Sequence, residues 1–156
     1  MKLITKIRLM IVFFMVALVL SGVTAFPVET ELKWLLSHPS LVPSFAQSWL
    51  QDVYNALKET NSKYPMLAYG YDWLAFAHIV IAMLFIGPLK DPVRNTWVID
   101  WAMLACIAVF PLAFIAGPVR TIPFFHILID CSFGLIGLVP LIICKRWIKQ
   151  LQAGKK

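Results

Sequence analysis

Five polar side chains in or beside apolar stretches have the chemistry to bind a metal or to move a proton. His126 and Asp130 are four residues apart, which puts them on one face of a helix. His78 interrupts another apolar stretch, and Asp72 and Arg120 stand just before the stretches that hold His78 and His126. Ionisable groups inside a membrane segment are costly enough to mark a functional site by default. We therefore take Asp72, His78, Arg120, His126 and Asp130 as the candidate polar or ligand cluster.

These residue types fit three functions and one structural role. Two histidines and a carboxylate, here His78, His126 and Asp130, match the ligand set of facial-triad sites for iron or another divalent metal. His78 and His126, on different helices, could instead be the axial ligands of a haem b. A protonatable Asp130–His126 pair would suit a small proton-coupled transporter that acts as a dimer. In the structural role, the same groups only hold helices together.

The composition indicates the elements that must position these side chains. Of the 156 residues, 60% are hydrophobic and 14% are charged, against about a quarter charged in a soluble domain. Several apolar runs approach the ~18 residues that span a bilayer. The sequence predicts an all-α, polytopic membrane protein that forms one membrane domain over residues 1–156, a bundle of four transmembrane helices. The predicted spans are residues 9–26, 71–88, 97–117 and 124–144, followed by a basic tail over residues 145–156.

The first apolar segment has two interpretations. It is either a retained transmembrane helix over residues 9–26 or a signal peptide. The second interpretation rests on the basic residues before it and on Val23 and Ala25 at the −3 and −1 positions of a cleavage site.

The polar stretch over residues 28–64 predicts a short helical cap. A helix over residues 28–37 should stop at His38-Pro39, because a residue before proline avoids helical dihedrals. Ser44 should open a second helix, with Gln47 completing a capping box. Apolar residues at helical spacing make this second helix amphipathic; they are Phe45, Trp49, Leu50, Val53, Tyr54 and Leu57.

The distribution of basic residues predicts the orientation. Ten of the fourteen Lys and Arg residues lie in the N-terminal segment, the loop over residues 89–96 and the tail. The positive-inside rule then places both termini in the cytoplasm and the 28–64 segment outside. We expect a bacterial cytoplasmic (inner) membrane as the location. At ~1.5 Å per residue, His78 and Asp130 would lie at similar depths in the outer half of the bundle, where Asp130 needs Arg120 or a histidine as its partner. Asp100 should pair with Arg94 or Lys145.

We expect a small, non-catalytic membrane protein, an accessory or structural subunit with a buried polar cluster in the outer leaflet. Its expected partners are the lipid bilayer and either further copies of itself or a larger membrane complex. The alternatives are the metal- or haem-binding redox protein or enzyme and the proton-coupled transporter. Nucleic-acid binding has no support, because topology explains the basic charge. The three cysteines, Cys106, Cys131 and Cys144, form no C-x-x-C motif and are interpreted as buried structural residues.

Overall fold

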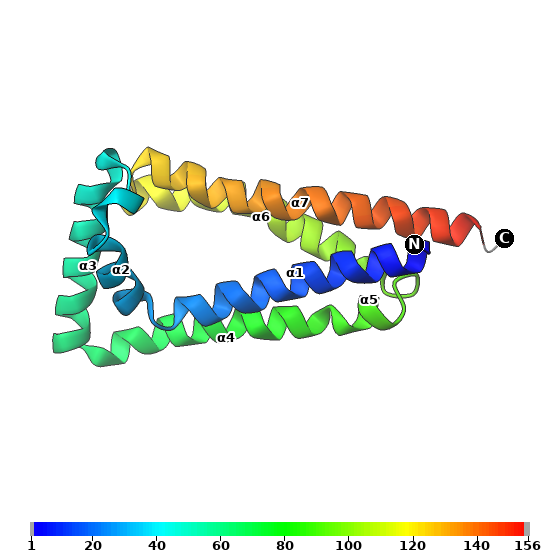
Figure 1. The fold of residues 1–156 in the computed structure, drawn as a ribbon, viewed down its shortest axis with the longest axis horizontal. Helices are drawn as coiled ribbons and strands as arrows, with labels where there is room; N and C mark the ends of the chain where they lie inside the picture. Colours follow the sequence, from blue (N-terminus) through cyan, green and yellow to red (C-terminus); the bar gives the residue numbers. More distant parts are fainter. Residues whose placement is uncertain (1, 155–156) are drawn as a thin grey trace. The chain divides into compact units, whose positions relative to one another are not determined.

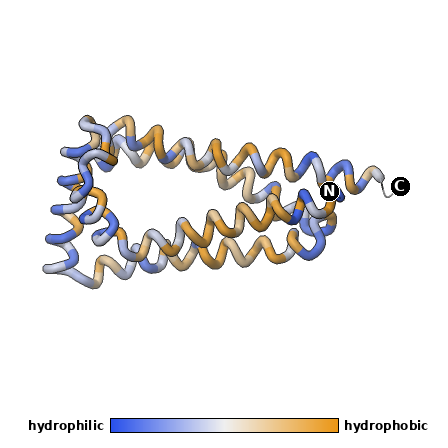
Figure 2. The backbone as a smooth tube through the Cα atoms, in the orientation of Figure 1, coloured by the Kyte–Doolittle hydropathy of each residue, from blue (hydrophilic) through white to orange (hydrophobic). Residues whose placement is uncertain are grey.

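The computed structural model describes residues 2–154, and all regular structure in that range is helical. Within residues 2–154, four stretches are long and apolar enough to cross a membrane: Leu3–Ala25, Pro65–Lys90, Thr96–Val119 and Phe124–Ala153. The predictions of an all-helical fold and of four long apolar helices are therefore confirmed. In Figure 2 the hydrophobic colour follows these stretches, while the hydrophilic colour marks the segment between the first two and the loop between the second and third.

The helices group into two compact units. The first contains the chain up to Val16 and from Ala82 onward, and the second contains Ala17–Ile81. The division falls inside α1 (Leu3–Ala25) and inside α4 (Ala68–Leu84).

The first unit is built on a hairpin of α6 (Thr96–Val119) and α7 (Phe124–Ala153), which lie side by side (Figure 1). A Cβ added to Gly134 would lie only 2.7 Å from the carbonyl oxygen of Cys106. The two backbones therefore approach more closely than a side chain would allow, as small residues permit between membrane helices. The hairpin core contains buried Ala113, Ile127 and Cys131.

The N-terminal part of α1 joins this hairpin. Its Ile7 and Ile11 are buried, and the ring of Phe14 lies 4.9 Å from that of Phe85. The Arg8 guanidinium donates hydrogen bonds to the carbonyl oxygens of Leu89 (3.1 Å) and Lys90 (3.3 Å). Arg8 therefore ties the start of α1 to the loop that precedes α6.

The helix predicted over residues 71–88 is interrupted. It forms α4, which ends at Leu84, and a short α5 (Ile86–Lys90). Pro88 has no N–H to donate to the carbonyl of Leu84, four residues earlier, so the regular hydrogen-bond ladder breaks there. The Asn95 amide then donates to the carbonyl oxygens of Gly87 (3.2 Å) and Asp91 (2.9 Å). These two hydrogen bonds hold α5 in place against the loop that follows it.

The second unit pairs the end of α1 with α4. A Cβ on Gly22 would lie 2.6 Å from the carbonyl oxygen of Ala75 and 3.1 Å from the Cβ of His78. Gly22 and Ala75 are both buried. This pair of helices, like α6 and α7, therefore depends on a close backbone approach at a glycine.

The polar segment of this unit forms α2 (Val28–Leu36), a 3-10 turn η1 (Pro39–Leu41), α3 (Ser44–Lys63) and a second turn η2 (Pro65–Leu67). Helix α2 ends just before His38-Pro39, which confirms the predicted stop. It packs on α3, and the Asn61 amide donates a 2.6 Å hydrogen bond to the Glu29 carboxylate.

The predicted capping box at the start of α3 is wrong. Pro43 occupies the cap position, Ser44 is already helical, and no side chain caps the helix. The Gln47 amide instead donates to the carbonyl oxygens of Pro39 (3.3 Å) and Val42 (3.1 Å). The Pro39 carbonyl also accepts the N–H of Val42 (3.2 Å). The Gln47 side chain therefore binds the 3-10 turn, whereas the sequence pattern assigned it to a backbone N–H.

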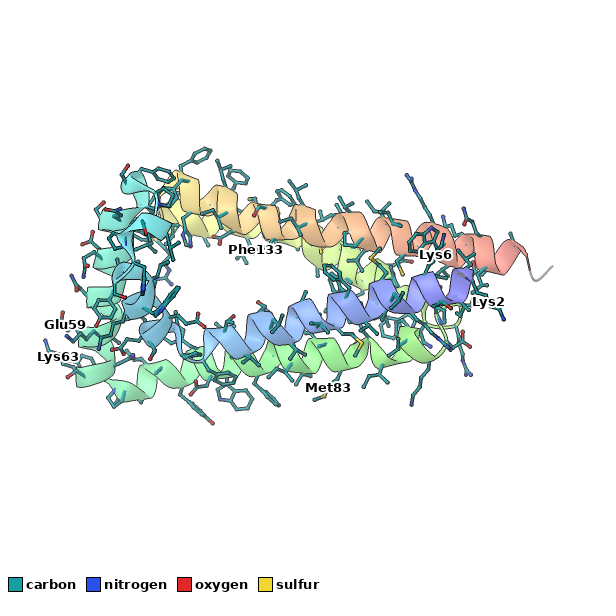
Figure 3. All side chains as sticks on the ribbon, in the orientation of Figure 1. Lys2, Lys6, Glu59, Lys63, Met83 and Phe133 are labelled. Atoms are coloured by element: carbon teal, nitrogen blue, oxygen red, sulfur yellow. The ribbon has the colours of Figure 1, made fainter. Side chains whose placement is uncertain are left out.

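The amphipathic pattern of α3 is confirmed with one exception. Five of the six predicted apolar residues are half-buried, whereas Phe45 is exposed. The opposite side of the helix carries an ion pair between Glu59 and Lys63 at 2.6 Å (Figure 3).

Candidate functional site

His126 and Asp130 form a pair on the first turns of α7. Pro123 has extended dihedrals and precedes the helix, which begins at Phe124. The His126 Nε2 and Asp130 Oδ1 atoms are 3.8 Å apart, and the side chains are 40% and 44% exposed. This distance is too long for a hydrogen bond, but it suits an ion pair when the imidazole is protonated. His126, one of the partners predicted for Asp130, therefore lies beside it.

A strained turn places Arg120 just before this pair. The N–H of Arg120 donates to the carbonyl of Ala116 (3.0 Å), and the N–H of Ile122 donates to that of Gly117 (2.9 Å). Between them Thr121 has a φ of 55°. The pattern is a Schellman motif, which normally has glycine at this left-handed position. Because a β-branched residue is unfavourable there, the turn stores strain, and it holds the backbone of exposed Arg120 in one geometry.

His78 lies in the middle of α4 and is half-buried. Its Nδ1 atom is 2.8 Å from the carbonyl oxygen of Leu74 in the preceding turn. A carbonyl only accepts hydrogen bonds, so we assign the proton to Nδ1 and leave Nε2 as an acceptor or ligand atom. Histidines that bind metals commonly use this arrangement. Asp72 lies six residues earlier on the same helix and is also half-buried.

The five cluster residues are divided between the two units. Asp72 and His78 belong to the second unit, and Arg120, His126 and Asp130 to the first. Within residues 2–154, no group of three or more His, Cys, Asp or Glu side chains is placed to hold a metal ion. The metal set of His78, His126 and Asp130 and the haem b site of the two histidines stay predictions.

Asp100 has the partner that the sequence suggested. Its Oδ1 atom lies 2.5 Å from Lys145 Nζ, so that this salt bridge joins α6 to α7. The prediction that Asp100 pairs with Arg94 or Lys145 is thereby confirmed for Lys145.

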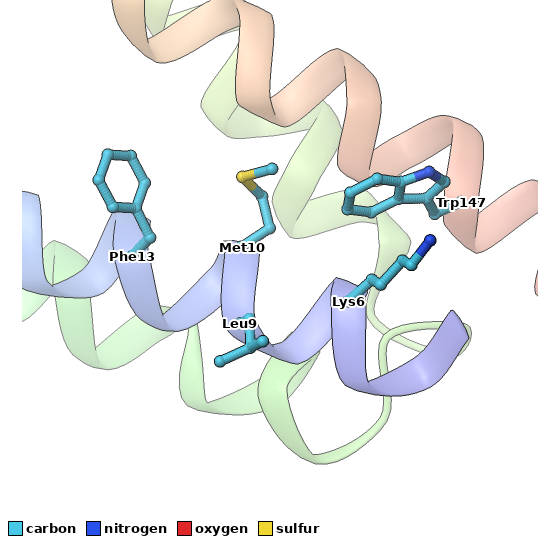
Figure 4. Close-up of a pocket in the computed structure, with 5 residues that line it drawn as sticks. All are labelled: Lys6, Leu9, Met10, Phe13 and Trp147. Carbon is cyan, nitrogen blue, oxygen red and sulfur yellow. The ribbon is translucent and has the colours of Figure 1, made fainter. Parts of the chain in front are cut away.

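Sequence reasoning missed a groove in the first unit. It has a volume of about 430 Å³ and is lined by Lys6, Leu9, Met10 and Phe13 of α1 and by Trp147 of α7 (Figure 4). The four α1 residues have helical spacing, which was a visible signal. Helix α1 is apolar on nearly all sides, however, so its sequence did not indicate which face was hollow. A comparison with known protein families, curated proteins and solved structures gave no match to the chain.

Proposed function

We propose that this chain is an integral membrane protein with four transmembrane helices and both termini in the cytoplasm. The four long apolar helices support the spans, and the concentration of Lys and Arg on one set of connections supports the orientation. In this arrangement α2 and α3 form a cap outside the membrane. We place it in a bacterial cytoplasmic membrane.

Reporter fusions test this topology. A green fluorescent protein fused after Ala153 should fluoresce, because it folds in the cytoplasm, and an alkaline phosphatase fused after Lys63 should be active, because it folds outside. The protein should also stay in the pellet after alkaline carbonate extraction. Fluorescence after Lys63 with phosphatase activity after Ala153 would contradict the orientation, and release by carbonate would contradict the spans.

We further propose that the protein is a non-catalytic accessory or structural subunit. The observation that carries this proposal is that several polar side chains in the spans have a partner on their own helix. His78 bonds to its own helix, and Thr24 Oγ1 and Ser132 Oγ donate to the carbonyls of Leu20 (2.9 Å) and Ile129 (2.6 Å). Asp130 has His126 on its own helix. Such groups can enter a bilayer without a ligand.

The apolar surface of α6 is where we expect a partner. Leu112 and Ile115 are 67% and 68% exposed. A photo-crosslinking amino acid at Ile115 should give one protein adduct of defined mass in native membranes, and the same probe at Glu59 of α3 should not. Adducts to lipid alone from Ile115 would contradict the role as a subunit.

The alternative with a specific observation in its favour is a metal or haem protein. It rests on the Nδ1–Leu74 bond, which presents the Nε2 atom of His78 as a ligand. The purified protein would show a Soret band lost in His78→Ala, or stoichiometric metal lost in Asp130→Ala. A colourless, metal-free protein in which both variants fold would favour the structural subunit.

A further inference from the structure

The groove on α1 combines an apolar floor with a cation at one end. Lys6, Met10 and Phe13 are spaced at i, i+4 and i+7, so they share one face of the helix. In Figure 4 the Lys6 ammonium lies near the Trp147 indole, and Phe13 lies at the opposite end. The groove is therefore polar at its cytoplasmic end and apolar toward the middle of the proposed span.

Its floor is closed by packing between α1 and α7. Ile11, Leu141 and Cys144 are buried behind the groove, and the space that they line with Met10, Phe14 and Pro140 holds no room for a water molecule. The groove is thus a surface depression open to the surroundings. Its volume of about 430 Å³ lies within the ~300–1,000 Å³ range of ligand pockets.

The charge at its end is available to a ligand. Among the ion pairs formed within residues 2–154, none uses Lys6. By contrast, Arg8 is bound to carbonyls of the 89–90 backbone, and Lys145 to Asp100. Lys6 therefore lines the groove as a cation outside these ion pairs.

We infer that this groove binds one anionic phospholipid of the cytoplasmic leaflet. The lipid phosphate would meet the Lys6 ammonium, with the Trp147 indole at headgroup level, where tryptophan is favoured. An acyl chain would lie along Leu9, Met10 and Phe13. Basic pockets beside transmembrane helices on the cytoplasmic side recognise anionic headgroups in this way. The inference rests on the proposed membrane insertion, and it adds a ligand class to that proposal.

The test is native mass spectrometry of the full chain released from nanodiscs that contain equal phosphatidylglycerol and phosphatidylcholine. The wild type should retain one phosphatidylglycerol in preference to phosphatidylcholine. Lys6→Gln should reduce this preference about fivefold, the effect expected of one lysine near an anionic surface. Lys90→Gln is the matched control, because it removes the same charge on the same proposed side from an exposed residue that does not line the groove.

A second variant tests the apolar floor. Met10→Trp should fill the groove and lower retention of both lipids, while Val12→Trp, at an exposed position of α1 outside the groove, should leave retention unchanged. Soluble glycerol phosphate should not displace the lipid, since it has no acyl chain.

Three results would overturn the inference: equal retention of the two lipids by the wild type, an unchanged preference in Lys6→Gln, or equal losses in Lys6→Gln and Lys90→Gln. These outcomes differ from failure of the proposed insertion. If the protein resists carbonate extraction but shows no lipid preference, only the inference about the groove fails. If carbonate releases the protein, both the proposed insertion and the inference about the groove fail.

Discussion

The pair α6–α7 and the pair α1–α4 solve the same packing problem with different chain connections. Both place a glycine where a Cβ would collide with a backbone carbonyl, at 2.7 Å for Gly134 and 2.6 Å for Gly22. The first pair is joined by a turn of four residues, 120–123, whereas residues 26–67 separate α1 from α4. We therefore expect α6 and α7 to resist separation more strongly than α1 and α4, although the two glycine contacts are similar. The short turn prevents α6 and α7 from moving apart.

The largest effect is expected at Gly134. A Gly134→Ala substitution should destabilise the protein by about 2–3 kcal/mol, the upper range for overpacking, since the new Cβ also meets Phe110 and Val109 at 3.2 and 3.5 Å. The measurement is unfolding of the detergent-solubilised protein followed by tryptophan fluorescence. Gly70→Ala is the control, because nothing lies within 4 Å of that Cβ. It should be neutral or stabilising by up to ~1 kcal/mol.

Gly22→Ala should cost less, about 1–2 kcal/mol, although its nearest contact is shorter. Helix α1 can shift away from Ala75 because residues 26–67 place no tight limit on it. The same unfolding assay measures the loss, and a double-cysteine cross-link between α1 and α4 would report the shift. A loss at Gly22 equal to or above that at Gly134 would refute the role given to the short turn.

Removal of the salt bridge should weaken α6–α7 by about 0.5–1 kcal/mol. Lys145 and Asp100 are 30% and 48% exposed, so solvent screens much of their attraction. Lys145→Met keeps the length of the side chain and removes its charge. The loss should disappear when Asp100→Asn is already present, and a double-mutant cycle of unfolding free energies measures this coupling.

The last expected effect, similar in size to that of the salt bridge, is a gain at the turn itself. Thr121→Asn should stabilise the protein by roughly 0.5–1 kcal/mol, because asparagine tolerates the left-handed conformation better than a β-branched residue. The φ of 55° at Thr121 is the basis for this sign. Thr96→Asn offers a contrast: Thr96 Oγ1 bonds to the Pro92 and Val93 carbonyls, both at 2.9 Å. That variant should lose stability.

Sequence reasoning predicted those features that depend on composition along the chain. Hydropathy located four long helices, and the His38-Pro39 dipeptide located the end of α2. Sequence reasoning placed the end of the second span at Pro88 itself, whereas the helical hydrogen-bond ladder breaks near Phe85. The reason is physical: a proline removes the partner of a carbonyl four residues earlier.

The candidate site was harder to predict for a related reason. Spacing correctly put Asp130 beside His126, because i and i+4 neighbours are fixed by the helix. Convergence of His78 with that pair depends on which faces of distant helices meet, and helices that are apolar on every side carry little information about their facing. The same uniformity hid the groove at Lys6 and Trp147.

Helix α7 has a consequence for the C-terminal end of the protein. It continues to Ala153, although the predicted span ended at residue 144, because Lys, Arg, Gln, Leu and Ala are good helix formers. Its 30 residues make a rod of about 45 Å, whereas the hydrocarbon core of a bilayer is ~30 Å thick. On the proposed insertion, the final turns of α7 extend beyond the hydrocarbon core as a continuous helix. Lys145 and Lys149 are four residues apart and lie on the same side of α7, so their charges are held one helical turn apart near the proposed headgroup level.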